Sequence, residues 1–187
     1  DLHYGVIGSG MMGIEHMANV RLLDGASVTA VADPHEASRN WAKLSASEAG
    51  DELEVFDDYR DMLGEVDAVI LCTPNHTHRS ILDDVFQTDL HVLCEKPMCT
   101  TLADARFVTA AAAEHAGVFQ VGMEYRWMPP VARLIDEVRA GTIGRLQMLA
   151  IREHRMPFLP KVGDWNRFAR NTGGTLVEKC CHFFDLM

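Results

Sequence analysis

The glycine spacing near the amino terminus constrains this chain more than any other feature. Gly8, Gly10 and Gly13 follow the G-x-G-x-x-G pattern that joins a β-strand to an α-helix in dinucleotide-binding folds. Gly8 permits a tight turn, Gly10 lets the backbone approach a pyrophosphate, and Gly13 lets the helix pack closely against the sheet. The N–H groups at the start of that helix, at Met11 and Met12, favour phosphate binding. The spacing therefore predicts a dinucleotide site.

An acidic residue stands where such a fold contacts a ribose. Asp33 closes the second expected strand, and its carboxylate can accept hydrogen bonds from a ribose diol. The same negative charge would repel a 2′-phosphate, so the sequence favours NAD over NADP. Arg39, about one helical turn further along, is the residue that would favour NADP instead.

Strands and helices alternate along the chain as far as residue 122. The fourth expected strand, 66–72, is continuously apolar, which is typical of a parallel strand covered on both faces. Asn75 is expected to cap the helix after it, and Thr100 or Thr101 the long helix that follows. The alternation predicts an α/β fold with a Rossmann-type, doubly wound parallel sheet over residues 1–122, whose ligand crevice lies at the carboxyl ends of its strands. The other expected strands are 3–7, 27–32, 54–56, 91–94 and 118–122.

The pattern changes after residue 122. A helix is expected over 131–140, with Gly141 just past its end, and a strand over 145–155. A helix and a long strand after a complete Rossmann unit predict that residues 123–187 begin a second α/β domain.

Gly173 and Gly174 are expected to begin a final helix after a loop over 156–172. Its helical pattern is still in progress at Met187. We therefore expect the chain to be part of a longer protein.

Charge and composition exclude several classes of function. The net charge is −10, and no Lys/Arg cluster is long enough for a nucleic-acid face. No apolar run approaches the ~20 residues of a membrane span. The cysteine count of five is odd, and the adjacent pair Cys180-Cys181 suits neither an ordinary disulfide nor a C-x-x-C site. All five cysteines are interpreted as reduced thiols of a cytoplasmic protein.

Two polar motifs follow buried strands at the edge where a cofactor would lie. Thr73, Pro74, Asn75 and His78 come after the fourth strand, and Glu95, Lys96 and Pro97 after the fifth. Pro97 disfavours the α region for Lys96 and so restricts the direction of its side chain. A lysine beside a nicotinamide is a reasonable acid/base. The alternative is a surface salt bridge of Glu95 with Lys96 or with a neighbour.

The final helix carries a second group of polar side chains. Glu178, His182 and Asp185 are spaced i, i+4, i+7 and share one helix face, and Lys179 can reach the same side. A histidine oriented by a carboxylate one turn away suits removal of a hydroxyl proton. The alternative is that His182 is a packed helix histidine. We expect no metal, because adjacent side chains such as Cys180 and Cys181 point ~100° apart on a helix.

In combination and order, these motifs resemble those of the Gfo/Idh/MocA family of nicotinamide-dependent sugar and polyol oxidoreductases, over essentially the whole chain. The resemblance implies a Rossmann domain followed by an α/β domain with a large open sheet, through which the protein would form a dimer or tetramer. It is carried by Gly8-Ser9-Gly10-Met11-Met12-Gly13, Asp33, Thr73-Pro74-Asn75 with His78, Glu95-Lys96-Pro97, Gly141 with Gly144, and Gly173-Gly174 with Leu176, Glu178, His182 and Asp185.

The resemblance also implies roles for individual residues. Lys96 is similar to the family lysine near the nicotinamide and the reacting hydroxyl, and His182 to the family acid/base. Glu178 stands where many members have an aspartate paired with that histidine, and Asn75 and His78 resemble residues that line the nicotinamide ribose. The remaining candidates for substrate contact are Arg126, Trp165, Arg167 and Lys179.

The sequence thus predicts hydride transfer between NAD and a sugar, cyclitol or related polyol, with Lys96 and His182 as the proton-handling pair and Glu178 orienting His182. Two alternatives stay open. An NAD-dependent glycosidase that works by transient oxidation would use the same residues but accumulate no NADH. A non-catalytic NAD-binding regulator would tolerate loss of Lys96 and His182.

Overall fold

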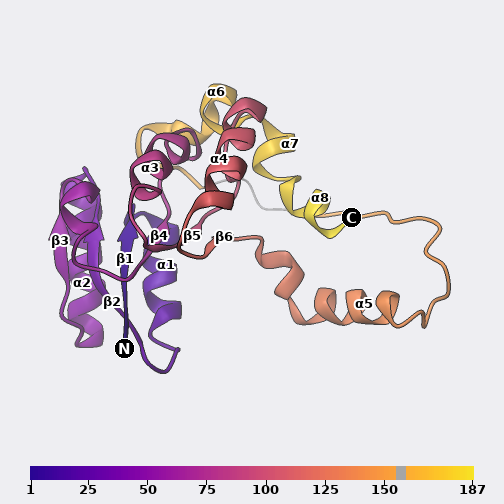
Figure 1. Ribbon diagram of the computed structural model, residues 1–187, viewed down its shortest axis with the longest axis horizontal. Helices are drawn as coiled ribbons and strands as arrows, with labels where there is room; N and C mark the ends of the chain where they lie inside the picture. The colour runs from indigo at the N-terminus through magenta and orange to yellow at the C-terminus, as the bar shows by residue number, and fades with distance from the viewer. Residues whose placement is uncertain (155–158) are drawn as a thin grey trace.

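The structure, a computed structural model, describes residues 1–154 and 159–187. In this part of the chain, six parallel strands form one sheet in the order β3-β2-β1-β4-β5-β6 (Figure 1). Strands β2 and β3 lie on one side of β1, and β4, β5 and β6 lie on the other, so the strand order changes direction between β1 and β4. In such sheets, ligands bind at the carboxyl ends of the strands beside this point. The predicted Rossmann-type doubly wound sheet is confirmed. The strands are β1 (Leu2–Ile7), β2 (Ala26–Ala32), β3 (Glu54–Phe56), β4 (Ala68–Leu71), β5 (His91–Cys94) and β6 (Phe119–Val121).

The apolar strands bury side chains on both faces of the sheet. Val6 and Ile70 pack with helices α1 (Met11–Val20) and α2 (Glu36–Ala49), whereas the next residues, Ile7 and Leu71, face the opposite cluster. Successive strand residues point to opposite faces, so a continuously apolar run fills two cores at once. Each such side chain contributes roughly 1.5–3 kcal/mol when it is fully buried.

The other face is covered by α3 (His78–Val85) and α4 (Leu102–Glu114). Thr101 caps α4 as expected, with its hydroxyl accepting the Asp104 N–H at 3.1 Å. The expectation that Asn75 caps α3 is wrong. A 3-10 turn, η2 (Asn75–Thr77), precedes the helix and places Asn75 before the capping position.

Beyond β6, the chain leaves the sheet. The 3-10 turn η3 (Glu124–Trp127) leads into α5 (Pro129–Arg139), and Gly141 follows the helix with φ 74°, as predicted. Figure 1 shows α5 and the segment after it projecting away from the sheet.

The strand expected over 145–155 is wrong for the part that is described. Residues 145–154 form no strand, and Arg155 lies outside the described residues. Apolar side chains alone do not hold a strand, because its N–H and C=O groups need a neighbouring strand. None is paired with residues 145–154 in the described part of the chain.

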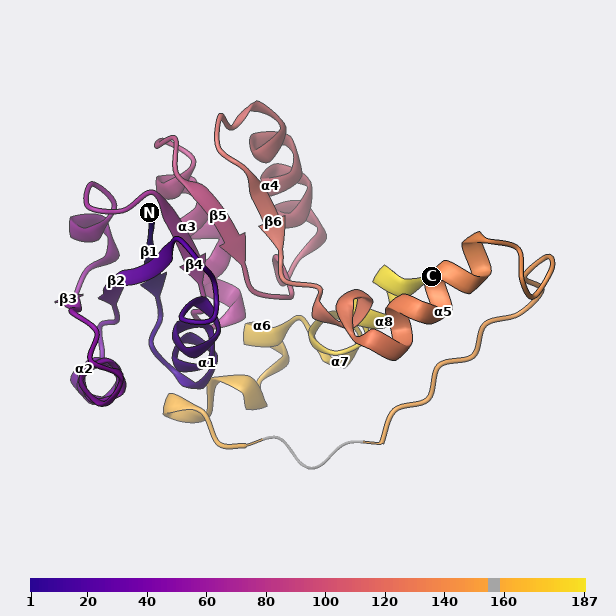
Figure 2. The ribbon, with the colours of Figure 1, turned by 90° about the horizontal axis from the view of Figure 1, so that it is seen from below.

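The last segment returns to the carboxyl edge of the sheet. It comprises the 3-10 turn η4 (Val162–Arg167) and the short helices α6 (Ala169–Thr172), α7 (Thr175–Glu178) and α8 (Cys181–Leu186). Figure 2 shows α6 and α7 alongside the sheet domain, while the segment after α5 loops away. Of the loop expected over 156–172, residues 159–161 are irregular and 162–172 form η4 and α6; residues 156–158 lie outside the description.

The single final helix that the sequence predicted is wrong, because it is broken between α7 and α8. The Cys180 N–H bonds to the Thr175 carbonyl at 3.3 Å, which closes a wide turn at the end of α7. Lys179 has φ −114°, which departs from helical geometry. Glu178 and His182 therefore lie on two different helices.

Candidate active site

The glycine loop between β1 and α1 is shaped to accept a phosphate. Gly8 has φ 93° and donates its N–H to the Ala32 carbonyl at 2.8 Å. A Cβ on Gly13 would lie 2.2 Å from the Gly8 carbonyl oxygen, so the close approach of helix and loop requires glycine. No described atom lies within 4 Å of a Cβ built on Gly10. The first-turn N–H groups from Met11 onward receive no side-chain cap among the described residues and suit an anion.

The side chain of Asp33 holds the glycine loop through a hydrogen bond to a backbone N–H group. One carboxylate oxygen accepts the Ser9 N–H at 2.9 Å, and the other accepts the His35 N–H at 2.8 Å. Asp33 is 7% exposed. Arg39 donates to the Asp33 backbone carbonyl at 2.7 Å, which places the guanidinium beside the residue expected to bind ribose.

The loop after β4 presents an unsatisfied donor. Asn75 is 6% exposed, and its side-chain Nδ2 has no hydrogen-bond partner among the described residues. Thr73 and Thr77 share a hydroxyl–hydroxyl bond of 2.7 Å, and the Thr77 hydroxyl donates to the Pro74 carbonyl at 2.7 Å. Because a buried donor without a partner costs about 1–3 kcal/mol, Asn75 fits a group that supplies an acceptor.

His78 is buried at the same edge of the sheet. Its ring is fully buried, with Nδ1 3.0 Å from the Pro97 carbonyl oxygen and Nε2 3.0 Å from that of Thr73. Burial lowers the pKa of His78, although both carbonyls favour the protonated ring. His78 thus joins the loop after β4 to the loop after β5.

The Glu95-Lys96-Pro97 motif follows β5 at the same edge. Glu95 accepts the Lys96 backbone N–H at 3.0 Å through one oxygen and contacts His16 Nε2 at 2.8 Å through the other. Burial raises the pKa of Glu95, but the bond and charge of His16, together with Lys96, outweigh it and leave that pKa lowered. Of the alternative salt bridges, the structure has the one with a neighbour, His16, and it is partly buried rather than at the surface.

His182 is enclosed by side chains from η3. It is 2% exposed and stacks in parallel on Tyr125, with ring centroids 4.0 Å apart. Its Nε2 lies 3.4 Å from Glu124 Oε1. The Tyr125 hydroxyl donates to Glu153 at 2.6 Å. Glu124 is therefore a carboxylate within ion-pair distance of the His182 ring.

Two lysines and a cysteine extend the site toward α7. Burial lowers the pKa of Lys161, and the charge of Lys96 adds to the effect. Burial raises the pKa of the Cys181 thiol, against the charge of Lys96. Lys179 Nζ lies 3.8 Å from Glu178 Oε1, and both side chains are less than one-fifth exposed. Cys181 also lines one pocket together with Pro97 and Met98, the residues that follow Lys96.

Arg126 and Asp185 form a bidentate ion pair between η3 and α8. Arg126 Nε donates to Asp185 Oδ2 at 2.8 Å, and Nη2 donates to Oδ1. The pair raises the pKa of Arg126. Asp185, expected on the same face as Glu178 and His182, instead fixes α8 to η3.

The other predicted contacts lie toward η2. The Trp165 ring centroid is 6.5 Å from that of His76, with a tilt of 55°. Asn171 donates to the Trp165 backbone carbonyl at 3.0 Å, which holds η4 against α6. Arg167 ends η4 at the exposed surface.

Thiol and metal chemistry receive no support from the described residues. All five cysteines are free, and burial raises the pKa of Cys72, Cys94 and Cys99, the last to about 11. Within residues 1–154 and 159–187, no group of three or more His, Cys, Asp or Glu side chains is placed to hold a metal ion.

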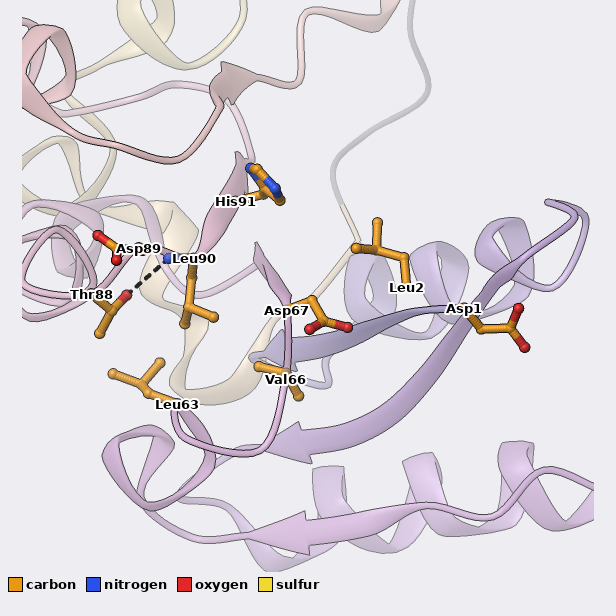
Figure 3. A pocket seen from close by; sticks show the side chains of 9 residues that line it. All are labelled: Asp1, Leu2, Leu63, Val66, Asp67, Thr88, Asp89, Leu90 and His91. Atoms are coloured by element: carbon orange, nitrogen blue, oxygen red, sulfur yellow. Dashed lines mark hydrogen bonds between the residues drawn. The ribbon is translucent and has the colours of Figure 1, made fainter.

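An open groove of about 760 Å³ lies at the opposite, amino edge of the sheet. Figure 3 shows its side chains, with Asp1 and Leu2 from the start of β1, Asp67 before β4 and His91 at the start of β5. Parallel sheets bind ligands at their carboxyl edge, so we assign this groove no role in the chemistry.

Four residues of the site escape the sequence patterns: His16, Glu124, Tyr125 and Lys161. His16 and Glu124 had a usable signal, because the first follows Gly13 by three residues and the second follows β6 at the carboxyl edge. Tyr125 lies in the short 3-10 turn η3 and Lys161 in an irregular segment, so no periodicity identifies their partners.

The residues at the carboxyl edge fit a dinucleotide. The open space over Gly10, the uncapped start of α1 and the unpaired Asn75 amide each match a need of a bound dinucleotide phosphate or ribose. The fold and the site together define an NAD-binding Rossmann oxidoreductase domain.

Comparison with known proteins agrees with this definition. Residues 2–123 match the family model described as "Oxidoreductase family, NAD-binding Rossmann fold", and residues 135–187 match "Oxidoreductase family, C-terminal alpha/beta domain". The chain belongs to the Gfo/Idh/MocA family of oxidoreductases.

Curated relatives cover the chain almost completely. The chain is 31% identical over 185 residues to "Rhizopine catabolism protein MocA" of Rhizobium meliloti, covering 98% of this chain and 55% of that protein. It is 35% identical over 144 residues to "Inositol 2-dehydrogenase 1" of Saccharopolyspora erythraea, covering 75% and 42%. The chain thus spans about half the length of the curated relatives it matches.

Solved structures show the same architecture. An NAD-binding protein from Listeria innocua matches 99% of this chain and 53% of its own, with a TM-score of 0.83 and 26% identity. Myo-inositol dehydrogenase from Lactobacillus casei, in complex with NAD(H) and myo-inositol, matches 76% and 42%, with a TM-score of 0.69 and 28% identity. In the described residues of our chain, no helix is long and apolar enough to cross a membrane.

Proposed function

We propose that the protein is an NAD-dependent dehydrogenase that oxidises a secondary hydroxyl of a cyclitol or related polyol, with Lys96 and His182 as its proton-handling pair. The observation that carries the proposal is the meeting of two elements at one edge. Lys96 follows β5 beside the dinucleotide loop, and the next residues, Pro97 and Met98, line one pocket together with Cys181, the neighbour of His182. The inositol dehydrogenases among the relatives support the polyol class.

His182 would take the proton of the substrate hydroxyl. Its low exposure excludes bulk water from the ring, and Glu124 at 3.4 Å stabilises the imidazolium that forms. Stacking on Tyr125 fixes the plane of the imidazole. Glu178, the carboxylate that the sequence pairs with His182, stays a candidate for the same role.

Lys96 would hydrogen-bond the reacting oxygen and stabilise the developing alkoxide. Glu95 fixes the Lys96 backbone through the Lys96 N–H, so the ammonium leaves the strand from a defined point. When bound, NAD supplies the acceptor for the hydride that leaves the carbinol carbon. The buried Asp33 carboxylate favours NAD over a cofactor with a 2′-phosphate.

The test mixes the complete protein with NAD and a panel of inositols and aldoses and follows the absorbance of reduced nicotinamide. Lys96→Ala and His182→Ala are expected to lose at least about 100-fold in kcat while still binding NADH. Lys43→Ala, an exposed lysine on α2, is the matched control. Turnover in both site variants at the wild-type rate would refute the proposal.

The same assay separates the remaining alternatives. A glycosidase would release its leaving group from a glycoside without net NADH, and a regulator would bind NADH but turn nothing over.

Glu124→Gln and Glu178→Gln, compared over pH, identify the carboxylate that supports His182. The variant that changes the pH profile of kcat is the partner, because loss of a carboxylate destabilises the imidazolium. Self-association of the complete protein is a further proposal, tested by its mass in solution.

A further inference from the structure

A partly buried histidine–carboxylate contact joins helix α1 to the loop after β5 that carries Lys96. His16 lies in α1, three residues after Gly13, and its Nε2 is 2.8 Å from Glu95 Oε1. The two side chains are only 17% and 12% exposed. The helix whose first turn faces the dinucleotide phosphates is therefore tied by one side-chain contact to the residue that precedes Lys96.

Glu95 is held on both of its oxygens. The second oxygen accepts the Lys96 backbone N–H at 3.0 Å. A Cβ on Gly122 would lie in ordinary van der Waals contact with Glu95 Oε1, at 3.5 Å, so Gly122 lies directly beside the carboxylate. The pKa of Glu95 is lowered against the effect of burial, which indicates a carboxylate that stays ionised between its donors.

The sheet does not need this contact for its own pairing. The Glu95 N–H already bonds to the Leu71 carbonyl at 2.9 Å, and the Gly122 N–H bonds to the Cys94 carbonyl at 2.8 Å. A buried ionic pair is also a weak source of stability, because desolvation offsets much of its attraction. The contact adds one constraint that the backbone lacks, namely the position of the Lys96 backbone relative to α1.

We propose that His16 and Glu95 are positioning residues that fix Lys96 relative to the dinucleotide-binding helix. This inference rests on the proposed function for its kinetic consequence, and on the hydrogen-bond geometry alone for its structural consequence. His16 touches neither the Lys96 ammonium nor a substrate in this scheme; it acts through Glu95.

The structural consequence is measured by amide hydrogen exchange on the complete protein. The Lys96 N–H is protected by Glu95, and Glu95 is held by His16. His16→Ala and Glu95→Ala should therefore both speed exchange at Lys96, by roughly tenfold or more, while the amides of β1 keep their protection. His3→Ala is the matched control, because His3 faces Asp67 at 3.8 Å in an exposed pair at the other edge of the sheet. Unchanged exchange at Lys96 in both site variants would overturn the proposal, whether or not a substrate is known.

The kinetic consequence is a split between kcat and cofactor affinity. His16→Ala should lower kcat by about 10- to 100-fold, as small misplacements of a catalytic group do, while the Kd for NADH changes less than about threefold. His16→Gln, which keeps an N–H donor, should recover most of the lost rate. In a double-mutant cycle, His16→Ala should add little to Glu95→Ala, because both remove one interaction.

A merely structural pair gives a different pattern. It would lower the melting temperature of His16→Ala and leave kcat of the folded protein at its wild-type value, which would refute the positioning role. Wild-type protein that shows NADH binding, protected Lys96 and no turnover with any polyol refutes the proposed function instead. The two failures are therefore distinguishable.

Discussion

The sheet domain and the segment after β6 achieve order in different ways. Residues 2–121 pair their strands with one another and bury apolar side chains on both faces of the sheet. In α5, by contrast, none of the described residues is buried, and Trp127, Leu134 and Ile143 in and around it are more than half exposed. The helices α6 to α8 gain their order from contact with the sheet domain and η3. The comparison teaches that the glycine loop is encoded locally, whereas His182, one of the two residues proposed to handle protons, lies in a segment docked from far along the chain.

The largest effect is expected from Gly13→Ala, a substitution in the sheet domain. The added Cβ would meet the Gly8 carbonyl oxygen at 2.2 Å, so loop and helix must separate. We expect a loss of about 1–3 kcal/mol in unfolding free energy and loss of measurable NADH binding. Thermal unfolding and NADH fluorescence titration measure the two effects.

Two other glycines make the Gly13 experiment specific. Gly10→Ala meets no described atom within 4 Å and should keep its stability while weakening NADH binding, because the methyl group occupies space meant for the pyrophosphate. Gly64→Ala, also in open space, should change neither. If Gly13→Ala, Gly10→Ala and Gly64→Ala had the same stability and the same NADH affinity, the glycine loop would not be the determinant of cofactor binding.

Gly173→Ala tests the docked segment. Gly173 has φ 76°, and its Cβ would lie 2.8 Å from the Thr100 carbonyl oxygen and 2.8 Å from Val177 Cγ1. The substitution should displace α7 and α8 from the sheet domain, lowering kcat at least tenfold while NADH affinity stays within about threefold. Steady-state kinetics and NADH titration provide the readouts.

Gly141→Ala is the control matched in backbone conformation. Its φ is 74°, but no described atom lies within 4 Å of the new Cβ, so it carries only the strain of a left-handed residue, about 1–2 kcal/mol. It should leave kcat near the wild-type value. If both variants lose activity equally, strain rather than docking explains the loss.

The smallest effect concerns the pH dependence of the sheet domain. The folded-state pKa of His78 is lowered from its ordinary value of 6.5 by burial. Below pH 6.5 the unfolded chain binds a proton that the folded protein does not, so unfolding free energy falls as the pH drops through this window and is flat above it. Denaturant titrations between pH 5 and 7.5 should show this slope in the wild type. A slope of equal size in His78→Gln would contradict the assignment.

The sequence alone was sufficient where local rules decide. The spacing of Gly8, Gly10 and Gly13 requires one loop geometry, and the apolar run that contains β4 requires burial on both faces. The doubly wound sheet, the cap at Thr101 and the dinucleotide site follow from such rules. The Gly141 turn after α5 is local in the same sense, because a positive φ favours glycine.

Only the tertiary structure decided which side chains meet. A helical pattern predicted that Glu178 and His182 share one face, but a wide turn at Lys179 places them on separate helices and brings Glu124 and Tyr125 to His182. The sequence predicts a strand over 145–155, but residues 145–154 have no strand to pair with in the described chain. Sequence periodicity reflects only the preferences of residues that are close along the chain. The contact of His182 with Glu124 and that of His16 with Glu95, which holds the Lys96 N–H, join residues tens of positions apart.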